Sequence, residues 1–160
     1  MDAKSQSPIL TFLLKAKHAT YASSDNADQL AGAQQPSSRP ASHDLAYREG
    51  DLFYLDTYLG GFSFAGEEAV WQKDIPLWSM NYYGTMVVDE IPEGFGHFLK
   101  LCLRQSPPQA PYRGPEHFES GRFSYTCSWE GRFEHFHGEE DIALDGVLIY
   151  TLSFHGGSIL

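Results

Sequence analysis

The sequence has 160 residues and a formal net charge of -10, and a chain of this length can bury a core without a metal or disulfide staple. Its 11 lysines and arginines are dispersed among 21 aspartates and glutamates, which disfavours a nucleic acid or an anionic membrane surface as a partner. No apolar run approaches the roughly 20 residues that a membrane-spanning helix needs. We therefore expect one domain over residues 1–160.

The first predicted element is a helix near the N-terminus. Ser7 suits the N-cap and Pro8 the first helical position, and apolar residues then recur at helical spacing, as at Ile9, Phe12 and Leu13. Residues 22–43 follow without a single aromatic side chain. Because their composition buries too little apolar surface to offset the entropy of ordering, we predict a mobile loop or linker within the domain.

The middle of the chain is typical of strands joined by tight turns. Gly50 suits the positive φ of a hairpin turn at residues 47–52. The odd-numbered side chains of residues 52–59 share the face that we expect to be core, and the opposite, amphipathic face carries Tyr54, Asp56 and Tyr58. Gly60 and Gly61 turn the chain into a return strand over residues 62–70, with Gly66 as a candidate bulge, and residues 77–88 form another strand.

A second helix and a C-terminal run of strands complete the prediction. Pro92 fits the first turn of the helix, and an apolar stripe follows at Phe95, Phe98, Leu99 and Cys102. After a proline-dense loop at residues 106–115, alternation along 123–129 and 144–155 is typical of antiparallel strands. We predict an α+β fold, with a mainly antiparallel sheet of about six to seven strands and two or so helices packed on one side.

The number and surroundings of the two cysteines indicate the cellular compartment. Cys102 and Cys127 lie in a predicted helix and a predicted strand among apolar neighbours, so we expect buried free thiols rather than a disulfide. The apolar run at residues 9–14 is short, is followed by lysines and lacks a small-residue cleavage pattern, which argues against a secretory signal. A cytoplasmic location is expected.

Several segments together resemble a conserved domain family of unknown function, which in some proteins appears downstream of a helix-turn-helix regulator. The matching motifs include YLDTYLGG at residues 54–61, FAGEEAV at 64–70 and WSMNYYG at 78–84, with further matches at 19–22, 47–50, 112–115 and 155–157. The resemblance spans nearly the whole chain and implies a single domain, but it implies no particular activity. We expect no DNA-binding segment ahead of the first helix.

A surplus of aromatic residues beside acidic ones at residues 50–84 predicts a shaped site. Our first hypothesis is a small-molecule-binding or sensory module with an aromatic-lined pocket, because such pockets combine ring walls with a few fixed polar groups. Since Glu67 and Glu68 are adjacent on a strand, they point to opposite faces and only one can join Asp56. The candidate ligand-binding residues are Asp56, Tyr58, Glu67, Glu68, Asn81, Tyr83, Arg113 and His155.

Two other functions fit the sequence. A hydrolase or isomerase would use Asp56, Glu67 or Glu68 with His155, which requires a carboxylate and an imidazole within hydrogen-bonding reach. An interaction module would pack exposed tyrosine and tryptophan rings against a protein partner or a second copy of the chain. The chain has no nucleophile elbow, phosphate loop or dinucleotide fingerprint, so we assign no catalytic residue and no cofactor.

A metal site is the remaining alternative. His135 and His137 share a strand face with Glu139 or Glu140 close behind, as in the first motif of cupin-like barrels. No proline precedes His155 to complete the second cupin motif, and we therefore assign no metal.

Overall fold

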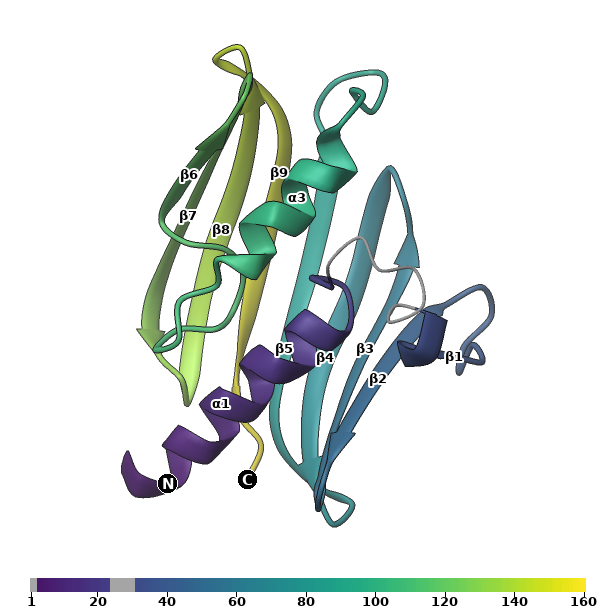
Figure 1. Ribbon diagram of the computed structural model, residues 1–160, viewed down its shortest axis with the longest axis vertical. Coiled ribbons are helices and arrows are strands. Elements are labelled where there is room, and N and C mark those ends of the chain that lie inside the picture. Colours follow the sequence, from purple (N-terminus) through teal and green to yellow (C-terminus); the bar gives the residue numbers. More distant parts are fainter. Residues whose placement is uncertain (1–2, 24–30) are drawn as a thin grey trace.

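Alternating side chains build one antiparallel sheet in the computed structural model, which describes residues 3–23 and 31–160 (Figure 1). Within those residues the sheet has nine strands, in the order β1-β2-β3-β4-β5-β9-β8-β7-β6. The strands are β1 (Gln34–Gln35), β2 (His43–Glu49), β3 (Leu52–Gly60), β4 (Ser63–Gln72), β5 (Ile75–Met86), β6 (His117–Ser120), β7 (Phe123–Arg132), β8 (His135–Leu144) and β9 (Val147–Ser158).

The predicted α+β fold with six to seven strands is wrong, because the described chain is largely β. The strands that sequence reasoning missed are short and lie toward the sheet edges, and β1 and β6 have only two and four residues. So few residues carry no readable alternation. Part of the loop predicted at residues 22–43 forms β1, and its residues 24–30 lie outside the described residues.

Helices α1 (Ala3–Ala19) and α3 (Phe95–Arg104) cross the same face of the sheet (Figure 1). The apolar stripe predicted for α3 is confirmed, since Phe98, Leu99 and Cys102 are buried. The helix starts were placed wrongly. Pro8 lies inside α1 rather than at its first position, and α3 begins after a left-handed Gly94, beyond Pro92.

The hairpin turn at Gly50 is confirmed, because Glu49 pairs with Leu52 and Gly50 has a φ of 59°. The burial predicted for β3 is reversed, however. Tyr54 and Asp56 are buried on the face covered by the helices, and the odd-numbered side chains lie on the other face. Gly66 forms no bulge. A Cβ at that position would lie 2.6 Å from the Cβ of Tyr58, so the glycine makes room for a ring on the neighbouring strand.

The strand order reveals a duplicated architecture. A helix followed by four sequential antiparallel strands occurs twice, as α1 with β2 to β5 and as α3 with β6 to β9, and the two halves join through β5 and β9. The registers agree: Asp56 pairs with Glu68 in the first half as Cys127 pairs with Glu140 in the second. The sequences share a Phe-x-Gly-Glu-Glu motif at residues 64–68 and 136–140.

Candidate functional site

A cavity of about 190 Å³ lies between the helices and the inner face of β3, β4 and β5. Aromatic and aliphatic side chains form most of its wall, and a small set of ionisable groups interrupts them. The lining side chains used below are Lys17, Tyr21, Tyr54, Asp56, Tyr58, Phe64, Glu68, Tyr82, Tyr112 and Arg113. The alternation of β3 and β4 places Tyr54, Asp56 and Glu68 on this face.

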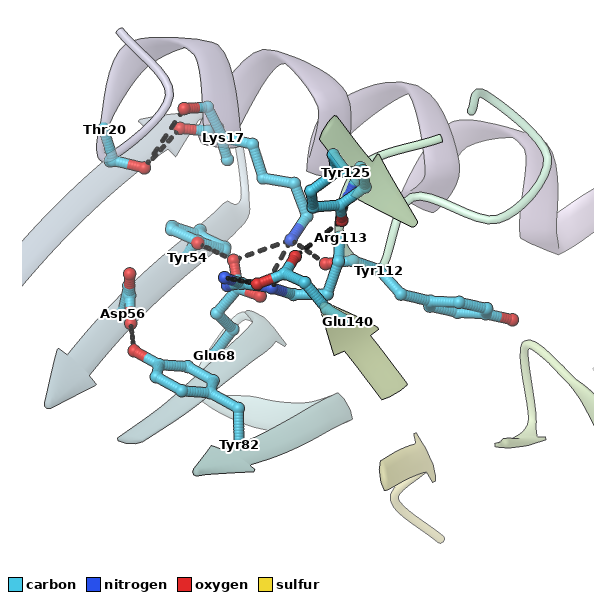
Figure 2. A network of polar contacts seen from close by, with 12 residues as sticks. Lys17, Thr20, Tyr54, Asp56, Glu68, Tyr82, Tyr112, Arg113, Tyr125 and Glu140 are labelled. Carbon is cyan, nitrogen blue, oxygen red and sulfur yellow. Dashed lines mark hydrogen bonds and ion pairs between the residues drawn. The ribbon is translucent and has the colours of Figure 1, made fainter. Parts of the chain in front are cut away.

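Lys17 extends from α1 to a carboxylate on the sheet (Figure 2). Its Nζ lies 2.8 Å from both oxygens of Glu68 and also donates to the carbonyl oxygen of Tyr112 at 2.9 Å. Tyr54 donates its hydroxyl proton to the same carboxylate. Because an ammonium group has three N–H donors, Lys17 is fully used by these contacts.

A second ionic cluster surrounds Glu140, which is completely buried on β8. Arg113, in the loop before β6, donates to both of its oxygens through Nε and Nη2, at 3.0 and 2.8 Å. Tyr125 and Tyr150 donate to the same carboxylate at 2.6 and 2.8 Å. The arrangement satisfies a buried charge, and it repeats the Tyr54–Glu68 contact in the other half of the fold.

Asp56 differs from these two carboxylates because no cation of the described side chains contacts it. In the part of the chain that the structure describes, its one side-chain hydrogen bond is donated by the Tyr82 hydroxyl to Oδ1 at 2.6 Å. The side chain is only 5% exposed, yet it lines the cavity. Burial, followed by the charge of Glu68, raises the pKa of Asp56 from 3.8 to about 7. The group therefore changes charge near neutral pH.

The structure divides the predicted site residues between two faces of the sheet. Asp56, Tyr58, Glu68 and Arg113 line the cavity together. The others follow the alternation to the opposite face, where Glu67 pairs with Asn81 and Asn81 with His155, and where Tyr83 is exposed. The candidate residues therefore do not meet in one site, because neighbouring strand positions point to opposite sides.

The same alternation removes the proposed carboxylate–imidazole pair. Asp56 and Glu68 lie on the covered face, away from His155. Glu67 shares the outer face with His155 but lies two strands from it in the register, which corresponds to about 9.6 Å at the usual strand spacing. Among the described residues no hydrogen bond or ion pair joins these two side chains, so the contact that direct proton transfer requires is not formed.

Sequence reasoning missed Lys17, Tyr54, Tyr82 and Glu140 as members of the site. Lys17 is separated in sequence from its partners, and no local pattern reveals a contact across 51 residues. Tyr54 and Glu140 could have been found in the sequence, because a tyrosine precedes a glutamate by 14 residues at Tyr54 and Glu68 and by 15 residues at Tyr125 and Glu140. The duplicated Phe-x-Gly-Glu-Glu motif is the signal that could have found them.

The remaining sequence hypotheses concern metals, thiols and membranes. The described residues contain no group of three or more metal-ligating side chains, and His135 and His137 are exposed. Cys102 and Cys127 are free and buried, as predicted. Among the helices in the described ranges, none has both the length and the apolar character required to cross a bilayer.

Comparison with known proteins gives a family but no activity. No curated protein and no solved structure matches the chain. A family model described as a domain of unknown function (DUF5680) matches residues 56–159, which include β4, β5, α3 and β6 to β9. The resemblance to a family without an assigned function is thereby confirmed. The chain belongs to the family described as a domain of unknown function (DUF5680).

Proposed function

We propose that this protein is a small-molecule-binding or sensory module and that the cavity lined by Asp56 is its site. The observation that carries the proposal is a carboxyl group in the cavity wall that, within the described part of the chain, accepts one side-chain hydrogen bond and contacts no cation. Burial of an unpaired carboxylate costs stability, and such costs are typical of functional positions.

The dimensions and chemistry of the cavity suit a small organic ligand. An apolar cavity of about 150 Å³ accommodates benzene. The cavity of about 190 Å³ therefore has room for one ring with a short substituent. Its walls are mostly aromatic and aliphatic, with Asp56 and Tyr21 among the polar groups that would fix the orientation of a ligand.

The experiment is a compound screen by thermal unfolding, followed by two matched variants. A compound at 100 times its Kd would add about 2.7 kcal/mol of stability. For a domain of this size we expect the melting temperature to rise by about 5–10 °C. Tyr58→Ala should weaken binding because Tyr58 lines the cavity, whereas Tyr83→Ala, on the exposed outer face, should not. Equal effects of the two variants would place the ligand elsewhere.

One observation favours a second function, an acid–base enzyme. A carboxyl group whose pKa is raised to about 7 is suited to exchange a proton with a bound substrate near neutral pH. Such an enzyme would use Asp56 without His155. Turnover of a bound compound, lost in Asp56→Asn while binding remains, would favour this function over simple binding.

Other features bear on the setting of the proposed module. The buried, unpaired thiols of Cys102 and Cys127 support a reducing, cytoplasmic compartment. In proteins where a similar domain follows a helix-turn-helix regulator, the cavity would act as the sensor. An interaction module is less favoured, because Tyr83 is the one tyrosine or tryptophan among the exposed large side chains of the described residues.

A further inference from the structure

The two halves of the fold provide an internal comparison of structural and functional residues. Tyr54 bonds to Glu68 in the first half, and Tyr125 bonds to Glu140 at the equivalent positions of the second. A buried cation completes each cluster, although it comes from α1 in one half and from a loop in the other. Because both halves retain the tyrosine–glutamate contact, we assign this contact a structural role.

The position of Asp56 breaks this correspondence. Its register equivalent is Cys127, since Asp56 pairs with Glu68 and Cys127 pairs with Glu140. The residue that bonds to Asp56, Tyr82, pairs with Gly66, and its equivalent Phe154 pairs with Gly138. The second half thus replaces the carboxyl–hydroxyl pair by a thiol and a phenyl ring, and both replacements are buried.

The second half also fills the corresponding space. The ring of Tyr112 stacks on Phe136 with centroids 3.8 Å apart and lies 6.1 Å from the ring of Phe154. The scaffold can therefore form this region from apolar groups alone. It follows that the fold does not require an acid or a hydroxyl at the positions of Asp56 and Tyr82, and their presence beside the cavity indicates a ligand.

The charges around the cavity indicate the sign of the charge on that ligand. Lys17 neutralises Glu68 and Arg113 neutralises Glu140, each at 2.8 Å. Ionised Asp56 is the charge left over, and Lys17 cannot turn to it because all three of its donors are engaged. Arg113 is held on both oxygens of Glu140. With every group ionised, this set carries a net charge of about -1 in a low-dielectric space. An anionic ligand would increase that excess.

We propose that the cavity binds a small organic ammonium ion whose charged group contacts the Asp56 carboxylate and whose apolar part packs against the tyrosine and phenylalanine walls. This inference rests on the proposed function and names its ligand class. A cation supplies the missing positive charge, and the rings accept it on their faces. Tyr82 and Tyr21 already face cations of the protein, with Arg113 at 5.5 Å and Lys100 at 5.9 Å from the respective ring centroids.

Binding of an ammonium ion should depend on the charge of Asp56. The groups that face this carboxyl come from every surrounding element; burial and the charge of Glu68 raise its pKa, against the lowering effect of the cations Lys17 and Arg113. They are Lys17 on α1, Tyr21 after it, Tyr54 and Tyr58 on β3, Glu68 on β4, Tyr82 on β5 and Arg113 in the loop before β6. Because the cation prefers the ionised carboxyl, its affinity should rise with pH through about 7.

The test uses three probes of similar shape, namely benzylamine, benzyl alcohol and benzoate, in titration calorimetry. Benzylamine should bind wild-type protein about tenfold more tightly at about pH 8 than at about pH 6, which is the change expected when a carboxyl group with a pKa of about 7 must ionise. The neutral and anionic probes should bind more weakly at the higher pH. Asp56→Asn should weaken benzylamine binding at least about tenfold and abolish its pH dependence. Glu67→Gln removes a carboxylate on the outer face and should alter neither the affinity for benzylamine nor its pH dependence.

The outcomes separate the inference from the proposed function. If benzyl alcohol or benzoate binds as tightly as benzylamine, or if benzylamine binding is the same at both pH values, the cavity does not select cations, although it still binds a ligand. If none of the three probes binds and the compound screen also fails, both proposals are wrong. The pH comparison uses wild-type protein, so it decides the matter even if Asp56→Asn does not fold.

Discussion

Replacing Asp56 by asparagine should stabilise the protein above neutral pH while removing its proposed ligand contact. Asparagine keeps an acceptor oxygen for the Tyr82 hydroxyl, which donates to Asp56 at 2.6 Å, but carries no charge. In the wild type, burial raises the pKa of Asp56 from 3.8 to about 7, which corresponds to a cost on the order of 4 kcal/mol for holding the ionised form in the folded state.

The sign of the pH dependence follows from proton uptake. Between about pH 4 and pH 7 the folded chain keeps a proton on Asp56 that the unfolded chain has released, so wild-type stability falls as pH rises. Below this window the carboxyl group is neutral in both states and the cost disappears. The advantage of Asp56→Asn should therefore be near zero at about pH 4 and approach the order of 4 kcal/mol above about pH 8.

Urea unfolding of wild type and variant at about pH 4, 5, 6, 7 and 8 measures this difference directly. Titrating groups that do not interact with Asp56 contribute equally to both proteins and cancel in the comparison. Glu68, whose charge helps to raise the pKa of Asp56, interacts with it and adds to the difference. Glu67→Gln is the matched control, because it removes a neighbouring carboxylate that faces away from the cavity, and its effect should not follow the same curve. A stability difference that stays constant with pH, or a variant less stable at about pH 8, would refute the reasoning.

Further predictions concern the second ionic cluster, the glycine beside the cavity and the thiols. Arg113→Met should lower the free energy of unfolding, measured in urea, by about 3–5 kcal/mol, because it leaves the buried Glu140 carboxylate without its cation. A smaller loss would show that water or a rearrangement compensates the charge. Gly66→Ala should cost about 1–3 kcal/mol and weaken any cavity ligand, since its Cβ would collide with two tyrosine side chains; unchanged binding would contradict the geometry. Burial raises the pKa of Cys127 to about 12 and also raises that of Cys102, so neither should react with iodoacetamide before unfolding. Mass spectrometry after native and denatured labelling checks this, and labelling of the native protein would refute it.

The elements that the sequence predicted well are those with long, regular patterns. The apolar stripe of α3 and the alternation of Tyr125 and Cys127 in β7 place the correct side chains in the core, because burial of a whole face fixes their orientation. The short edge strands could not be predicted. For β3 the sequence predicted the wrong face as core. Tyr54 and Asp56 are less apolar than the odd-numbered side chains of the same strand, yet they lie on the face that the helices cover.

Four of the eight candidate residues line the cavity, and the alternation of the strands explains why the other four do not. Asp56, Tyr58 and Glu68 share a face by alternation, which a sequence pattern shows, but which face the helices cover is decided by the fold. Glu67, Asn81, Tyr83 and His155 were included by proximity along the chain. Contacts made by Lys17 and Arg113 depend on where α1 and the loop at residues 106–115 cross the sheet, and no local pattern encodes that placement.

The ionic clusters also explain why a hollow persists beneath the helices. Lys17 ties α1 to β4, and Arg113 ties the loop before β6 to β8, so two covering segments are fixed to the sheet by buried charge pairs. Removing either partner would strand a charge, which penalises shifts that would let these segments collapse into the cavity. In the second half, Tyr112 fills the corresponding region by stacking on Phe136. The first half keeps its space open at the position where Asp56, bonded to the Tyr82 hydroxyl, lines it, as a ligand-binding site requires.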